Sequence, residues 1–131
     1  MEFTLTKTIN IKANPDQVWN YVSDLSQWPQ WAIHNVQDAQ KGENGYWFLA
    51  GPRGVSKVRM NANQALGILD HEFLDPAEGH WLVPCRVVVG HEGAHFLITF
   101  TKPDPMPSAD FEKGMELVNE ELIQLKDILE K

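Results

Sequence analysis

The sequence predicts an α+β fold in which a strongly curved antiparallel sheet wraps around one long C-terminal helix. Residues 2–12 alternate apolar and polar side chains, as a half-buried strand does. Residues 36–102 then alternate short apolar runs with glycine-rich turns, and residues 108–129 carry apolar side chains at helical spacing. Because the helix stripe and one face of the sheet must both be buried, we expect them to pack against each other.

Size and charge narrow the function classes. The 131 residues suffice for a single hydrophobic core, and we expect residues 1–131 to form one domain. A net charge of −7 argues against binding to nucleic acid or anionic membranes, because both need Lys and Arg. The single cysteine, Cys85, excludes an internal disulfide and suits a reducing compartment. With no signal-peptide pattern and no run of about 18 apolar residues, we expect a cytoplasmic protein without membrane insertion.

Two short helices are expected after the first strand. Asn14 is a good N-cap, Pro15 suits the first helical position, and Asp16 favours the positive end of the helix dipole. The helix that they start is about two turns long. Residues 26–31 predict a second short helix, with Ser26 near its start.

The middle of the chain is typical of an antiparallel meander. Turn signals lie at residues 42–45, which include the Asn-Gly hairpin pair, and at 51–54, 75–79 and 90–93. The strands expected around these turns are 46–50, 55–62, 66–74, 81–89 and 95–101. Connections this short join antiparallel strands, because parallel strands need long crossovers.

The last segment predicts a long amphipathic helix. It follows the proline-rich residues 103–107, and Ser108 is a suitable cap. Its apolar residues form one stripe: Phe111, Met115, Val118, Leu122, Leu125 and Leu129.

Three N-terminal segments resemble the START-like or SRPBCC superfamily, which includes Bet v 1-like and polyketide cyclase/dehydrase-like proteins. They are residues 13–19 (A-N-P-D-Q-V-W), 23–25 (S-D-L) and 28–31 (W-P-Q-W). The later order of elements also matches, and residues 69–71 and 83–87 are similar to those of small bacterial members. The resemblance implies a helix-grip fold, in which an antiparallel sheet grips the C-terminal helix over a deep apolar cavity. It implies no cofactor.

The strand over residues 66–74 places a histidine on its apolar face. Leu69, His71 and Phe73 share that face, so His71 faces the cavity if the face is buried. There it could anchor a ligand, or act as a general base toward a carbonyl or enol. A core histidine without catalytic duty is the alternative interpretation.

Aromatic and sulfur-containing residues are the other candidates for a ligand site. The five tryptophans are many for this length, and core packing accounts for each one singly. Cys85 lies on an apolar strand face, where it behaves as a small hydrophobe and not as a nucleophile. The expected ligand-binding residues are Trp28, Trp31, Trp47, Met60, His71, Phe73, Trp81, Cys85, Phe96, Met115 and Val118.

Residues 91–95 (H-E-G-A-H) fit the zinc-protease pattern H-E-x-x-H. That pattern works on a helix, where residues four apart share one face. Here it contains a glycine and lies between two strand-like runs, so we expect a hairpin turn and no metal site.

The leading hypothesis is binding of a small hydrophobic or aromatic molecule, lipid or polyketide-like, between the sheet and the C-terminal helix. The alternative is a cofactor-free cyclase, dehydratase or aromatase in which His71 moves a proton. A third hypothesis, a protein-interaction module, needs an exposed apolar patch. The sequence leaves open whether the protein is a monomer or a homodimer, and whether its own side chains fill the cavity.

Overall fold

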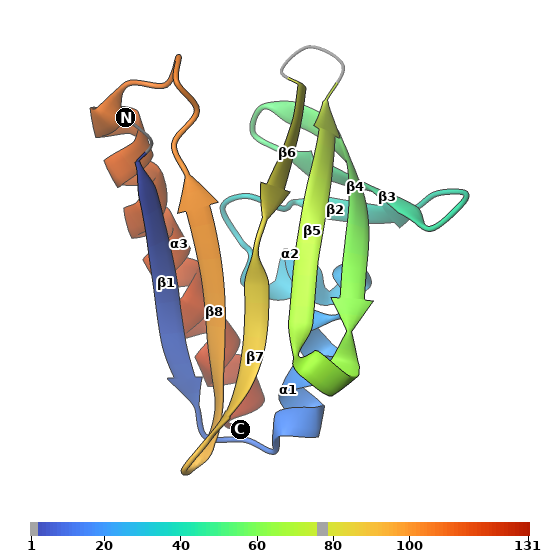
Figure 1. Ribbon diagram of the computed structural model, residues 1–131, viewed down its shortest axis with the longest axis vertical. Helices are drawn as coiled ribbons and strands as arrows, with labels where there is room; N and C mark the ends of the chain where they lie inside the picture. The colour runs from blue at the N-terminus through green and yellow to red at the C-terminus, as the bar shows by residue number, and fades with distance from the viewer. Residues whose placement is uncertain (1–2, 76–78) are drawn as a thin grey trace.

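The computed structural model describes residues 3–75 and 79–131, which form a curved antiparallel sheet with a long helix packed beside it (Figure 1). The chain begins with β1 (Thr4–Ile11), α1 (Pro15–Val22), the 3-10 turn η1 (Leu25–Gln27) and α2 (Trp28–Trp31). Then follow β2 (Asp38–Lys41), β3 (Tyr46–Gly51), β4 (Gly54–Asn63), the 3-10 turn η2 (Gln64–Leu66), β5 (Ile68–Asp75), β6 (Gly79–Val83), β7 (Cys85–Gly90) and β8 (Gly93–Thr101). The chain ends with α3 (Ser108–Leu129). This confirms the predicted α+β helix-grip fold.

The sheet brings the two ends of the chain together. Its strand order is β1-β8-β7-β5-β4-β3-β2, and β6 pairs with β5 beside this path. Every pairing is antiparallel, and β1 runs against β8 from Thr4↔Thr101 to Ile11↔Ala94. In Figure 1, α3 lies behind β1 and β8, while α1 and α2 lie behind the other half of the sheet.

Local chemistry explains where several elements begin. Asn14 caps α1, since its side-chain oxygen accepts a hydrogen bond from the Asp16 N–H at 2.8 Å. In the β2–β3 hairpin, Asn44 and Gly45 adopt φ of 57° and 78°, as a type I′ turn requires. The Ser108 cap was a wrong prediction, because α3 begins at Ser108 and no side chain caps it. Instead, the Pro107 carbonyl accepts from two N–H groups of the first turn.

A proline divides the strand that the sequence predicts over residues 81–89. Pro84 has no N–H to donate to the ladder, so the pairing changes there. On one side β6 pairs with β5, and on the other β7 pairs with β8 and shares with β5 the single ladder pair Ile68↔Arg86. The sequence also failed to predict β2, because its residues are polar and mostly exposed. The predicted turn at 75–79 includes residues 76–78, which lie outside the described residues.

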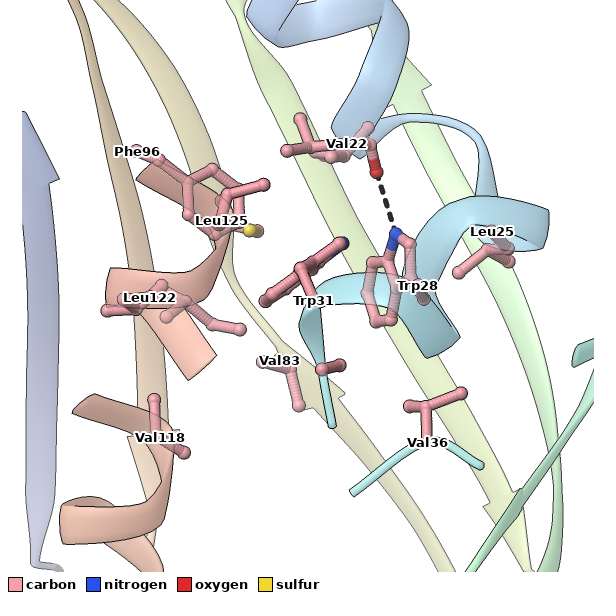
Figure 2. Packing of buried hydrophobic residues seen from close by; sticks show 14 of the residues in the cluster. Val22, Leu25, Trp28, Trp31, Val36, Val83, Phe96, Val118, Leu122 and Leu125 are labelled. Atoms are coloured by element: carbon pink, nitrogen blue, oxygen red, sulfur yellow. Dashed lines mark hydrogen bonds between the residues drawn. The ribbon is translucent and has the colours of Figure 1, made fainter. Parts of the chain in front are cut away.

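The core lies between the concave face of the sheet and the helices. Val118, Leu122 and Leu125 bring the stripe of α3 into it, as predicted. Trp28 and Trp31 of α2 lie between this stripe and the sheet (Figure 2). Among residues 3–75 and 79–131, no helix has both the length and the apolar character that crossing a membrane requires.

Gly93 should be intolerant of a side chain. Its φ of 143° is strained for other residues, and a Cβ there would lie 2.1 Å from the Ile11 carbonyl oxygen. We expect Gly93→Ala to lower the free energy of unfolding by at least about 2 kcal/mol. The control is Gly114→Ala in α3, where a Cβ meets nothing within 4 Å and the helix gains up to about 1 kcal/mol. Urea denaturation of both variants tests this, and equal midpoints would contradict it.

Candidate functional site

The register of the strands places the predicted strand residues on the concave face. One row across the sheet pairs Trp47 with Val58, Val58 with Phe73, and Phe73 with Trp81. The next row pairs Met60 with His71, and His71 with Val83. Alternation along β5 therefore predicted the correct face.

The opposite face of these strands carries ion pairs beside exposed apolar side chains such as Leu82, which is 49% exposed. Arg59 pairs with Glu72 at 3.0 Å, and Arg86 pairs with Asp70. The Glu72 carboxylate also accepts from Asn61 at 3.1 Å, and that hydrogen bond is the largest cause of its lowered pKa. These charged groups lie on the outer face, whereas the two rows described above lie on the concave face.

Six rings form a continuous aromatic row that runs from the core to the surface. Neighbouring ring centroids are 5.1 to 5.9 Å apart. Phe73 and Trp81 are stacked, with 10° between their planes, and the other contacts are edge-on. Exposure rises from 0% at Phe96 to 38% at Trp81. The aromatic row, in order, is Phe96, Trp31, Trp28, His71, Phe73 and Trp81.

The other predicted site residues lie close to this row in the core. Cys85, Met115 and Val118 are buried in the hydrophobic cluster, and Trp47 and Met60 pack against it. The structure thus brings the predicted set to one side of the sheet. Whether these residues bind a ligand stays a prediction.

Two surface hollows lie away from the aromatic row. One, of about 370 Å³, is formed by the β2–β3 turn and includes Tyr46, Phe48 and Lys57. The other, of about 190 Å³, lies between β1 and α3, and Met115 is the one predicted site residue that lines it. Along the aromatic row itself, the rings are in contact with one another.

His71 is a buried, neutral imidazole. It is 2% exposed, and its Nδ1 lies 3.3 Å from the Leu69 carbonyl oxygen. Burial lowers the pKa of His71 from 6.5 to about 4, because a positive ring would lose its hydration. The ring is therefore uncharged at neutral pH.

Cys85 has the properties of a core residue. It is 1% exposed, and burial, reinforced by the nearby Asp70 carboxylate, raises the pKa of its thiol. The thiolate, which is the nucleophilic form, is therefore suppressed.

Glu121 is a buried carboxylate that the sequence reasoning missed. It lies on α3 and is 3% exposed. Its Oε2 accepts from the backbone N–H groups of His34 and Asn35 at 3.0 Å each, and its Oε1 accepts from Asn35 Nδ2 at 2.8 Å. It thereby ties the turn after α2 to the helix. Glu121 stands three residues after Val118 and four before Leu125, so its spacing places it on the apolar side of the helix. That spacing was the sequence signal that could have predicted its burial.

The H-E-G-A-H segment lies in a hairpin, as predicted. His91 and Glu92 form the turn between β7 and β8, and His95 lies within β8. Glu92 pairs with Lys12 at 3.5 Å, which ties this turn to the end of β1. The helical geometry that the zinc motif needs is therefore absent from these described residues.

Comparison with known protein families identifies the chain. A family described as "Polyketide cyclase / dehydrase and lipid transport" matches residues 2–119. The chain belongs to this family. Family and fold together suggest a protein that binds hydrophobic ligands or resembles polyketide cyclases. No curated protein is similar enough in sequence to match the chain.

Solved structures with little sequence similarity share this fold. A protein from Bacillus halodurans has a TM-score of 0.73 at 21% identity, covering 98% of this chain and 97% of that chain. A START superfamily protein from Mycobacterium smegmatis has a TM-score of 0.71 at 15% identity, covering 97% of each chain. The Aha1 dimer from Colwellia psychrerythraea has a TM-score of 0.75 at 13% identity, covering 98% of this chain and 96% of that chain. At these identities the likeness concerns the fold alone.

Glu121→Gln should destabilise this family member. An amide turns one acceptor oxygen into a donor that faces other donors, which costs about 1 to 3 kcal/mol. Glu120→Gln is the matched control, because that side chain is 60% exposed and its carboxylate pairs with the His34 ring. Its effect should stay within about 0.5 kcal/mol. Urea denaturation measures both, and equal losses would mean that the buried hydrogen bonds add nothing.

His71 should make stability depend on pH. Its pKa is lower in the folded chain, about 4, than the ordinary 6.5. Between these values the unfolded chain binds the extra proton, so stability rises with pH and is lost as pH falls from 6.5 toward 4. From pH 7 to pH 5 the loss due to this group is about 2 kcal/mol.

Denaturation of the wild type and of His71→Gln at both pH values measures this contribution. The variant should lose less stability between pH 7 and pH 5, because glutamine does not titrate. The same pH dependence in both proteins would rule out His71 as its source.

Proposed function

We propose that the protein binds a small apolar, aromatic molecule between α3 and the concave face of the sheet. The observation that carries the proposal is the aromatic row, which connects the exposed Trp81 to the buried Phe96. An aromatic ligand can make the same kinds of edge and stacked contacts with these rings. The family and the fold support the same kind of ligand.

We propose that the ligand enters at the outer end of the aromatic row. Trp81, at this end, belongs to the segment of β6, Pro84 and β7. The last backbone hydrogen bond between that segment and β8 runs from the Thr99 N–H to the Pro84 carbonyl, at 2.9 Å. Beyond it, β6 pairs with β5 alone among the described strands, and it diverges from β8 (Figure 1). Trp81 lies on β6, where it pairs with Phe73 of β5. A ligand that separates β6 from β8 breaks no ladder hydrogen bond.

Binding is favoured over the cyclase or dehydratase alternative. A general base works best when its pKa lies near the working pH. The pKa of His71 is about 4, so at neutral pH its ring is a weak base that cannot hold a proton taken from a substrate. The same neutral ring can accept a hydrogen bond from a ligand.

Two experiments test the proposal. Native mass spectrometry of the freshly purified, untagged protein should reveal a bound apolar species. Titration with the uncharged fluorescent probe N-phenyl-1-naphthylamine should saturate. In Trp81→Ala the outermost ring is lost, and the affinity for the probe should fall about tenfold.

Leu82→Ala is the matched control. Leu82 is the next residue of β6, is 49% exposed, and pairs with Glu72 on the outer face. Its truncation should change the affinity less than about twofold. Equal losses in the two variants, or a wild type that binds the probe without saturation, would contradict the proposal.

A further inference from the structure

The indole N–H of Trp31 is a buried donor without an acceptor. Trp31 is 3% exposed, and its Nε1 has no hydrogen-bond partner in the described part of the chain. The neighbouring Trp28 differs, because its Nε1 donates to the Val22 carbonyl at 2.9 Å (Figure 2). Buried indole N–H groups ordinarily find an acceptor. An oxygen atom of a bound molecule would supply the one that Trp31 lacks.

His71 offers the complementary group. The Leu69 carbonyl near Nδ1 can only accept, so the proton of the neutral ring resides on Nδ1. Nε2 is then left with a lone pair. The rings of His71 and Trp31 both contact Trp28, at centroid distances of 5.1 and 5.3 Å. The residue that lacks an acceptor and the residue that offers one are therefore both neighbours of Trp28 in an apolar interior.

The charges of the interior exclude anions. Within residues 3–75 and 79–131, the buried polar or charged side chains are His71 and Glu121. The Glu121 carboxylate is already held by the turn after α2. Lys7, whose strand position faces the same side, lines the hollow between β1 and α3 together with Glu112 and Glu116. A carboxylate at the aromatic row would be buried without a positive partner, which is costly.

We infer that the interior takes an uncharged aromatic ligand whose oxygen accepts a hydrogen bond from Trp31 Nε1 and whose hydroxyl donates to His71 Nε2. This inference rests on the proposed function and adds the chemical class of the ligand. A phenol, a naphthol or an aromatic hydroxyketone belongs to that class. A fatty acid and a plain aromatic hydrocarbon do not.

The state of His71 supports this class. Its pKa of about 4 keeps Nε2 unprotonated at neutral pH, so the nitrogen accepts a hydrogen bond and attracts no anion. Trp28 and Phe73 contact the ring of His71, and the effect of burial on its pKa outweighs the opposing effects of the Leu69 carbonyl and the Asp70 carboxylate.

Three probes with the same ring system test the inference on the wild type. Naphthalene has no polar group, 2-naphthol has a hydroxyl, and 2-naphthoate has a carboxylate. Equilibrium dialysis should show 2-naphthol binding at least about fivefold more tightly than naphthalene, as two added hydrogen bonds require. It should show 2-naphthoate binding more weakly than both.

Variants test the two hydrogen-bonding groups. Trp31→Phe keeps a ring and removes the N–H, so the preference for 2-naphthol over naphthalene should fall by at least about twofold, as the loss of one of the two hydrogen bonds requires. His71→Phe should lower the same preference. Trp28→Phe is the control, because its N–H is committed to Val22, and it should change both affinities alike. In the wild type, 2-naphthol should also shift the indole N–H signal of Trp31 in NMR spectra, which needs no variant.

The outcomes separate this inference from the proposed function. Saturable binding of naphthalene with no preference for 2-naphthol, or an unchanged preference in Trp31→Phe, overturns the inference and leaves the proposed function standing. Tight binding of 2-naphthoate also overturns the inference. Binding of none of the three probes overturns both.

Discussion

The packing of Trp28 and Trp31 between α3 and the sheet is the interaction on which the rest of the structure depends. α2 has only four residues, and a helix so short is unstable alone, because nucleation fixes several residues for one hydrogen bond. Burial of the two indoles holds it in place, and each buried ring contributes about 2 to 3 kcal/mol. Glu121 fixes the turn that follows. Through α2 the sheet, the first helix and α3 become one core.

Three polar groups in this core meet the cost of burial in different ways. Glu121 is surrounded by three hydrogen-bond donors. His71 gives up its charge, which lowers its pKa to about 4, and keeps one hydrogen bond to its own strand. Trp31 has no acceptor for its N–H among the residues that the structure describes. The contacts of Glu121 are structural, whereas the N–H of Trp31 points to a ligand and the neutral ring of His71 offers that ligand an acceptor.

Pro84 connects the sheet to the proposed function. By ending the pairing with β8, it separates β6 from the strands next to α3 and leaves Trp81 at the surface. The stacked pair of Trp81 and Phe73 then joins the surface to the buried rings. One residue without an N–H thus decides that the aromatic row has an exposed end.

The sequence by itself determined the order of elements other than β2 and the division of residues 81–89, together with the inward face of β5 and the stripe of α3. Those features follow from periods of 2 and 3.6 residues and from turn chemistry such as Asn44-Gly45, which are local properties of the chain. Tertiary structure alone decided the pairing partners of β6 and β7, the partners of Glu121 and the contacts between the aromatic rings. These depend on which distant segments meet. Alternation shows that His71 faces inward, but only the packing of Trp28 and Phe73 against it removes the water and, with it, the charge.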